Sequence, residues 1–315
     1  MVNIQSIHPT MVNRKNLIQF LSDLLYQAIK VDHSPPPNNH PIILINAVKN
    51  IIGDDKVNPS TNLCEFSKSL IDSYPVRKDD EQIWKDVIAE GTRLSVFTDE
   101  VEKAVMEGDL DKAQVETARQ IIASNNSPAI LELLAELAIH NVDQLGLFTY
   151  HWLRSYHFYQ NEKALWSYSM CMISELFKST LEPISQEKRQ TPRDFIPWII
   201  SPENIDSIPV FAAMLRLGDG DYVRTNSFNK AISKWLAELQ LDQSQQVNIS
   251  SFELENYVLS GGNYFIDLAV KIINRFPQSV SVNKIIQLEA LRSIAKQSKP
   301  ESFQQIANCL NFLVQ

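Results

Sequence analysis

Apolar side chains along this chain recur every three or four residues, which is the spacing of a helix face that packs against a core. Residues 14–30 set the pattern, because seven apolar side chains between Leu17 and Ile29 fall on one side of a helix. Comparable segments recur to the end of the chain, and no alternating apolar run is long enough to require a sheet. The pattern therefore predicts an all-α protein of about fourteen helices.

Short breaks separate neighbouring helices, which favours antiparallel helix hairpins. Gly108 and Asp109, for example, separate helices predicted over 99–107 and 110–123. Hairpins of this kind also build α-solenoids, so solenoid stacking stays open as one arrangement of them. No repeat of fixed length recurs along the sequence, however, and the predicted fold class is a large multi-helix globular domain.

Proline is concentrated between residues 183 and 209, where five of the chain's 15 prolines occur. Loops of this length are uncommon inside compact domains. The segment therefore predicts either a surface crossing within one helical domain, 1–315, or a boundary between two parts, 1–182 and 205–315. Because it also contains several large apolar side chains, we expect it to pack against the body of the protein.

The segment of most distinctive composition lies in mid-chain, in helices predicted over 128–140 and 144–160. Eight of the chain's 28 aromatic residues lie between Phe148 and Tyr168, and three of its six histidines fall in these two helices. Few polar side chains interrupt the first of them, and a helix that is apolar nearly all round is buried. We therefore expect this segment to form the centre of the fold and to border any binding site.

Glu132, Glu136 and His140 form one row, because they are four residues apart on a predicted helix. Carboxylates and imidazoles from facing helices hold iron or manganese in helical bundles, and His151 or His157 would complete such a set. The spacing differs from the Glu-x-x-His motif of those bundles, and a polar row is also what a helix shows to solvent. The sequence leaves both interpretations open, an iron or manganese site and a solvated edge.

The second of these helices carries candidates for binding an apolar small molecule. They are Tyr150, His151, Trp152, Arg154 and His157. A pocket lined by aromatic rings and one or two histidines would suit a flat hydrophobic ligand. The two histidines lie about 240° apart around the helix and face different sides, and dense aromatic rings are also ordinary core residues. We expect a pocket to border Tyr150, His151 or His157.

Charge and cysteine content narrow the class of protein. The 37 acidic and 29 basic side chains give a formal charge of −8, which argues against a nucleic-acid partner. The sequence contains no run of about 18 apolar residues, so we expect no membrane span. We also expect no secretion, because no apolar leader is evident. The three cysteines lie far apart and are typical of reduced thiols, so we predict a cytoplasmic protein.

Catalytic motifs are absent from the sequence, which has no nucleophile elbow, no His-Glu-x-x-His and, with eight glycines, no phosphate loop. Two functional hypotheses remain. The first is a non-catalytic helical protein that binds a partner protein or an apolar small molecule. The alternative is a metal- or cofactor-dependent oxygenase or oxidoreductase, with a His, Glu and aromatic pocket between the helices predicted over 128–140 and 144–160.

Overall fold

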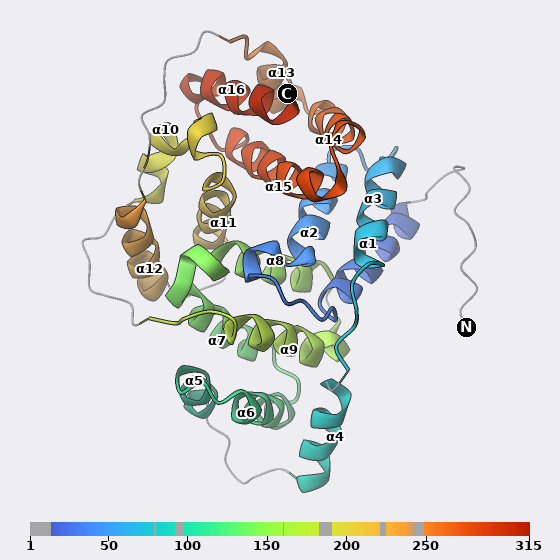
Figure 1. The fold of residues 1–315 in the computed structure, drawn as a ribbon, viewed down its shortest axis with the longest axis vertical. Coiled ribbons are helices and arrows are strands. Elements are labelled where there is room, and N and C mark those ends of the chain that lie inside the picture. The colour runs from blue at the N-terminus through green and yellow to red at the C-terminus, as the bar shows by residue number, and fades with distance from the viewer. Residues whose placement is uncertain are drawn as a thin grey trace.

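Helix α2 (Pro41–Ile52) lies in the middle of the molecule, and all but one of its residues are buried (Figure 1). The sequence explains its start. Pro41 suits the first turn, where an amide hydrogen would have no partner, and His40 caps the helix because its Nδ1 accepts from the Ile42 amide at 3.2 Å. The rest is a run of apolar side chains, so α2 offers a core surface on nearly every side. Helices α1, α3, α8, α14 and α15 pack around it.

The computed structural model describes residues 14–78, 80–91, 98–159, 161–182, 191–220, 225–239, 241 and 249–315. Within them the chain forms sixteen α-helices: α1 (Arg14–Ala28), α2, α3 (Thr61–Ile71), α4 (Asp80–Glu90), α5 (Thr98–Met106), α6 (Leu110–Ala123), α7 (Ala129–Ala138), α8 (Val142–Tyr159), α9 (Leu165–Leu176), α10 (Ile196–Ile199), α11 (Ile208–Asp219), α12 (Thr225–Glu238), α13 (Phe252–Ser260), α14 (Tyr264–Arg275), α15 (Gln278–Ala295) and α16 (Phe303–Val314). Over the same residues, the only β feature is an isolated bridge between Val31 and Val76. The all-α prediction is confirmed.

Helices from both halves of the sequence pack together in the centre. In Figure 1, α13–α16 lie at one end of the long axis and α4–α6 at the other, with α2, α8 and α11 between them. Both α2 and α11 pack against α8 and against α15. Contact between helices so far apart in sequence differs from the neighbour-only contacts of a solenoid, and α-solenoid character is not confirmed.

The proline-rich crossing packs onto this body where the structure describes it. Residues 183–190 lie outside the described residues, but 191–209 include short turns and α10, with Ile196 and Ile199 buried. Trp198 is an exception, at 57% exposed. Buried apolar residues on both sides of the crossing belong to one hydrophobic cluster. The division of the chain into one or two domains stays a prediction.

The mid-chain segment is largely buried, but its helices divide differently from the prediction. Helix α7 ends at Ala138, and a 3-10 turn, Ile139–Asn141, connects it to α8. Asn141 Oδ1 accepts a hydrogen bond from the Gln144 amide at 3.0 Å, which satisfies a free donor in the first turn of α8. His140 therefore lies in the turn between the helices rather than at the end of the first one.

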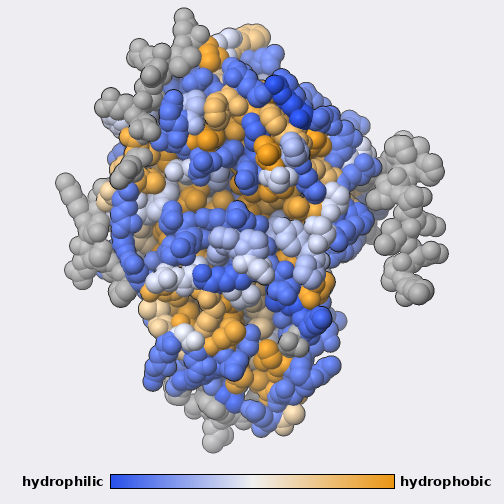
Figure 2. All heavy atoms as spheres, in the orientation of Figure 1, coloured by the Kyte–Doolittle hydropathy of each residue, from blue (hydrophilic) through white to orange (hydrophobic). Residues whose placement is uncertain are grey.

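The face shown in Figure 2 mixes hydrophilic and hydrophobic residues, and hydrophobic residues gather over its upper half as well as over the lower part, which contains α4–α6. Exposed apolar residues of these three helices include Ile88, Met106 and Leu110. Over the part of the chain that the structure describes, no helix combines the length and the apolar character needed to cross a bilayer.

Candidate functional site

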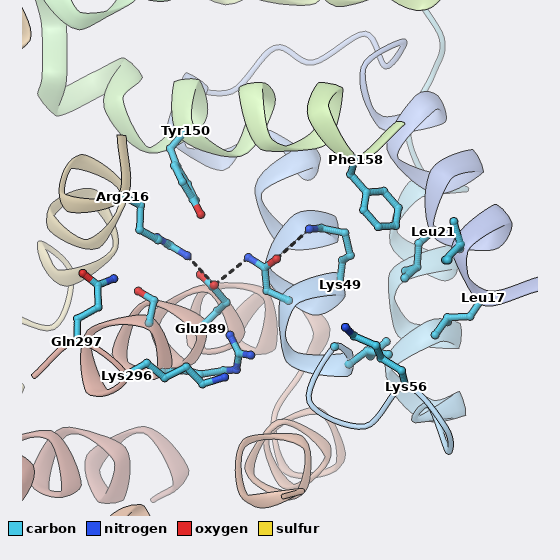
Figure 3. Close-up of a pocket in the computed structure, with 16 residues that line it drawn as sticks. Leu17, Leu21, Lys49, Lys56, Tyr150, Phe158, Arg216, Glu289, Lys296 and Gln297 are labelled. Atoms are coloured by element: carbon cyan, nitrogen blue, oxygen red, sulfur yellow. Dashed lines mark hydrogen bonds and ion pairs between the residues drawn. The ribbon is translucent and has the colours of Figure 1, made fainter. Parts of the chain in front are cut away.

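A pocket of about 500 Å³ opens beside the carboxyl end of α2, between α1, α8, α11 and α15 (Figure 3). One wall is apolar and comes mainly from α1, through Leu17, Ile18 and Leu21. Ile52 of α2 and Phe158 of α8 extend it. The wall across from α1, formed by α2, α11 and α15, is charged. The pocket therefore joins an apolar surface to a polar one.

The charged wall carries more positive than negative side chains. Its five cations are Lys49, Lys56, Arg216, Arg292 and Lys296, and its one carboxylate is Glu289. This surplus stands in contrast to the formal charge of −8 for the whole chain. Charges of one sign that line a concave, partly desolvated site attract ligands of the opposite sign.

Glu289 lies at the centre of the charged wall. Its Oε1 accepts hydrogen bonds from Arg216 Nη1 at 2.6 Å and from Asn50 Nδ2 at 2.9 Å. Burial favours the neutral acid, but the charges of Arg216 and His151 outweigh it and lower the pKa of Glu289 to about 2. The Arg216 guanidinium also stacks on Tyr150, 4.1 Å from the ring centroid. Glu289 is therefore ionised and already bonded at neutral pH.

Arg216 keeps one donor group without a partner. Its Nη1 bonds Glu289, and its Nε donates to the Ala212 carbonyl oxygen at 3.1 Å. Its Nη2 is buried and has no hydrogen-bond partner among the described residues. A buried donor left unpaired costs about 1–3 kcal/mol.

Asp54 connects the cations at the mouth of the pocket. Its carboxylate accepts hydrogen bonds from Arg292 Nε at 2.7 Å, from Lys296 at 3.0 Å and from the Tyr257 hydroxyl at 2.7 Å. Burial opposes ionisation, but the bonds from Arg292 and Tyr257 lower the pKa of Asp54 below its ordinary value. Lys296 and Lys56 are exposed, so two positive charges remain at the solvent edge.

Lys49 is buried, with 9% of its surface exposed. Its Nζ donates to Asn50 Oδ1 at 2.9 Å and lies 4.9 Å from the centroid of the Phe158 ring. Burial, followed by the charge of Arg154, lowers the pKa of Lys49 to about 8, against a smaller opposing effect of Glu289. Asn50 hydrogen-bonds both Lys49 and Glu289 and so lies between them. The amide therefore separates the amine from the carboxylate.

The ligand-binding residues proposed from the sequence separate around α8. Tyr150 lines the pocket. His151 is buried behind it and bonds Asn46 at 2.8 Å, and burial lowers the pKa of this histidine to about 3. Trp152 points into the core, where its indole donates to the Tyr168 carbonyl oxygen at 2.9 Å.

Arg154 and His157 also lie outside the lining of this pocket. Arg154 acts at a distance, through its charge on Lys49. His157 is exposed, and its Nδ1 lies 2.8 Å from the Leu153 carbonyl oxygen. Of the five residues proposed to bind an apolar ligand, the structure thus brings Tyr150 to the wall of the pocket and leaves the other four outside it.

The proposed iron or manganese ligands do not converge. Glu132 is exposed, and Glu136 and His140 are partly buried. His140 Nδ1 lies 3.0 Å from the Glu182 carbonyl oxygen, beside a separate cavity of about 210 Å³. Among the described residues, no three His, Cys, Asp or Glu side chains are placed to hold a metal ion. Within the described part of the chain, the row of three therefore gives the metal hypothesis no ligand set.

A second group of titratable side chains is buried beside the amino end of α2, and we refer to it as the histidine cluster. Glu175 lies 3.8 Å from His33 and 4.0 Å from His40, and it bonds Lys178 at 2.6 Å. Cys171 Sγ lies 3.7 Å from His40 Nε2. Burial lowers the pKa of His40 and raises that of Cys171 to about 12. Both groups are therefore neutral at pH 7.

Known proteins provide no functional parallel for this arrangement. No protein-family model, curated protein or solved structure matches this chain. An all-helical fold hosts many unrelated functions, so the fold class alone assigns none. The charges, contacts and burial of the pocket residues therefore have to carry the functional argument.

The sequence analysis did not identify the residues of the charged wall, although the sequence contains a signal for three of them. Lys49 and Arg216 are each the only charged residue among the apolar side chains of 41–52 and 208–217, and Glu289 lies within Ile285–Leu291, which is otherwise uncharged. A charge in a helix that is otherwise buried is costly unless it has a partner or faces a cavity. Charged residues within apolar helices would thus have identified all three.

Proposed function

We propose that this protein binds a small organic anion with an apolar chain in the pocket between α1, α2, α8, α11 and α15. The observation that carries the proposal is the surplus on the charged wall, five cations against one carboxylate. A small molecule is one of the two kinds of partner that the sequence leaves open. The cations refine its chemistry from apolar to amphipathic, and binding it requires no reaction.

The cations favour a carboxylate or a phosphate as the anionic group. Arg216 and Arg292 already hold Glu289 and Asp54, so they act on such an anion through their charge, while the exposed ammonium groups of Lys56 and Lys296 can donate to its oxygens. Because the pocket is partly desolvated, its charges are screened less than those on an open surface. An anion in this pocket should therefore gain more binding free energy than an anion beside exposed lysines.

The apolar wall gives the ligand its second property. Leu17 and Leu21 of α1 and Phe158 of α8 line the side of the pocket away from Arg216 (Figure 3). Each methylene group that a ligand buries against such a wall contributes about 0.8 kcal/mol. Affinity should therefore rise with the length of an alkyl chain until the pocket is filled.

Titration calorimetry with nonanoate, hexanoate and nonanol tests both properties. We expect nonanoate to bind at least about tenfold more tightly than nonanol, because only the acid carries a charge for the cations. Hexanoate should bind more weakly than nonanoate. Equal affinity for nonanol and nonanoate, or binding of neither, would contradict the proposed function.

Lysine variants test whether the anion sits in this pocket. Lys56→Gln and Lys296→Gln remove exposed cations at its mouth, and each should weaken nonanoate binding about threefold at low salt. Lys85→Gln and Lys103→Gln are matched controls, because they remove exposed cations that lie outside the pocket. Equal weakening in both pairs would indicate general attraction to the protein surface rather than a site.

We also propose that the protein functions in the cytoplasm. Cys64, Cys171 and Cys309 are all free thiols, which supports a protein of the reducing cytoplasm. A disulfide in the protein purified from its native cells would contradict this assignment. The oxygenase alternative has no specific observation in its favour among the described residues.

A further inference from the structure

Lys49 differs from the other lysines of the pocket by its burial and its partners. It lies in the last turn of α2, faces the cavity and is 9% exposed. Its Nζ bonds one neutral group, Asn50 Oδ1, and stacks above Phe158. Among the described residues, no carboxylate lies within ion-pair distance of it. A buried amine that opens onto a cavity without a counter-ion is unusual for a structural lysine.

Charges on three neighbouring helices act on this amine. Arg154 of α8, Arg216 of α11 and Arg292 of α15 disfavour its protonation, while Glu289 of α15 favours it. Asn50 and Arg216 hold the Glu289 carboxylate, so it does not pair with the amine. With a pKa of about 8, roughly one Lys49 side chain in ten carries a neutral amine at pH 7.

We propose that Lys49 is a nucleophile that forms a Schiff base with an aldehyde or ketone whose anionic group is held by the cations of the charged wall. The inference rests on the proposed function, because the same pocket and the same cations hold the ligand. Desolvation and adjacent positive charge are the two means by which proteins keep a lysine amine neutral and reactive. Lys49 has both, and its site has room for the carbonyl compound.

The step balances without any further reactant. The Nζ lone pair attacks the carbonyl carbon, and the electrons of the C=O π bond move to the oxygen, which takes up a proton. The nitrogen loses one proton, which gives the carbinolamine. The hydroxyl group of the carbinolamine takes up a second proton and leaves as water while the C=N bond forms, and the nitrogen loses its remaining proton. The sum is one amine and one carbonyl compound giving one imine and one water, with no change of oxidation state. Water that enters the pocket exchanges the protons.

The pocket also determines where the carbonyl carbon lies. Lys49 lies between Arg216 on one side and Leu17 and Leu21 on the other (Figure 3). An oxo acid with its anionic group at the arginines and its chain along the apolar wall passes the amine. Positioning of this kind turns a slow reaction between separate molecules into a reaction within one complex.

Borohydride trapping with azelaic semialdehyde, a nine-carbon aldehyde acid, tests the inference on the full-length protein. Reduction converts the imine to a stable secondary amine, and peptide mapping then locates it. We expect one adduct per chain, at Lys49, at probe concentrations where nonanal labels it at least about tenfold less. The initial labelling rate should rise with pH to a midpoint near the pKa of about 8.

Lys284 provides an internal control in the same experiment. Burial also lowers the pKa of this lysine, but its Nζ bonds the Leu313 carbonyl oxygen outside the pocket. Labelling at Lys284 should be at least about tenfold below that at Lys49, because its amine lacks the pocket's cations. Equal labelling of the two lysines, or adducts spread over surface lysines, would overturn the inference.

Variants of Lys49 separate this inference from the proposed function. Lys49→Met and Lys49→Arg should lose the adduct, and both should still bind nonanoate, weakened by no more than about tenfold. If the wild-type protein binds nonanoate but is not labelled at Lys49, the nucleophile is disproved and the anion site stands. If it does not bind nonanoate, the proposed function fails first. Mapping on the wild-type protein decides the matter even if a variant does not fold.

Discussion

The pocket and the histidine cluster lie at opposite ends of α2 and use buried polar groups in different ways. The cluster gathers His33, His40, Cys171, Glu175 and Lys178, the residue types from which active sites are commonly built. In it, His40 caps the helix and Glu175 pairs with Lys178, so charge is balanced. The residue types of the pocket are less typical of active sites, but its lining has more positive than negative charges, and they face a cavity.

The difference teaches that residue type is a poor guide to a site in this protein. Cys171 and His40 are held neutral by burial, and both have partners within the cluster. Buried polar atoms without a hydrogen-bond partner among the described residues occur in both regions, at His33 and Glu175 Oε2 in the cluster and at Arg216 Nη2 beside the pocket. An imbalance of charge beside open volume distinguishes the pocket from the cluster, and three predictions test that distinction.

The largest expected effect comes from removing the central carboxylate of each region. Glu289→Leu should lower the free energy of unfolding by about 4 kcal/mol, because it leaves Arg216 buried without its counter-ion. Glu175→Leu should cost about 2 kcal/mol, because Lys178 is 23% exposed and keeps the His33 carbonyl and water as partners. Urea unfolding followed by circular dichroism measures both. Equal losses would remove the distinction between the two regions.

Acid should destabilise the fold through His151. Burial lowers the pKa of this histidine from 6.5 to about 3, with Glu289 opposing and Arg216 adding to the shift. Between those values the unfolded chain binds a proton that the folded chain does not, so stability is full above pH 6.5 and is lost as pH falls toward 3. At about pH 4 the loss should reach about 3 kcal/mol.

His151→Gln should remove this part of the pH dependence in urea unfolding at pH 6.5 and pH 4. His157→Gln is the matched control, because His157 is exposed on the same helix. The lowered pKa of His40 acts in the same direction from within the histidine cluster, so some acid sensitivity should remain in both variants. Identical pH profiles for His151→Gln and the wild-type protein would contradict the prediction.

The smallest effect concerns one lysine from each region, Lys49 from the pocket and Lys178 from the histidine cluster. Lys49→Met should raise the free energy of unfolding by about 2 kcal/mol at pH 7, because the folded protein then no longer buries an ammonium group that lacks a counter-ion. As pH rises above the pKa of about 8, the folded amine is already neutral while the unfolded one is not, so the wild-type protein gains stability. The difference should narrow toward pH 10. Lys178→Met should instead destabilise, since it unpairs Glu175.

Helices and burial could be read from the sequence because both depend on local periodicity. The apolar run over 41–52 and the spacing over 14–30 predict α2 and α1 within two residues. The break at Ala138 was missed because the turn there depends on Asn141, whose side chain caps α8. Aromatic density between Phe148 and Tyr168 indicated the centre of the fold, and Trp152 shows that these rings serve packing.

The pocket could not be assembled from local patterns. Asn50 and Glu289 form a hydrogen bond across 239 positions, and Arg292 reaches Asp54 across 238. Nothing in either segment specifies the other, because each is an ordinary helix face until tertiary packing brings them together. Glu132, Glu136 and His140 were proposed as metal ligands because of their spacing along one predicted helix. A metal site in a helical bundle needs ligands that converge from several helices.

The positive charge of the pocket implies a more negative net charge on the rest of the protein. Five lining cations, less Glu289 and the Asp54 that pairs with two of them, leave a surplus of three, so the remainder of a chain of net charge −8 carries −11. An anionic molecule that diffuses toward the protein therefore meets repulsion before it meets attraction. Added salt should screen both the repulsion outside the pocket and the attraction within it. The association and dissociation rates of the anion should therefore both rise with ionic strength.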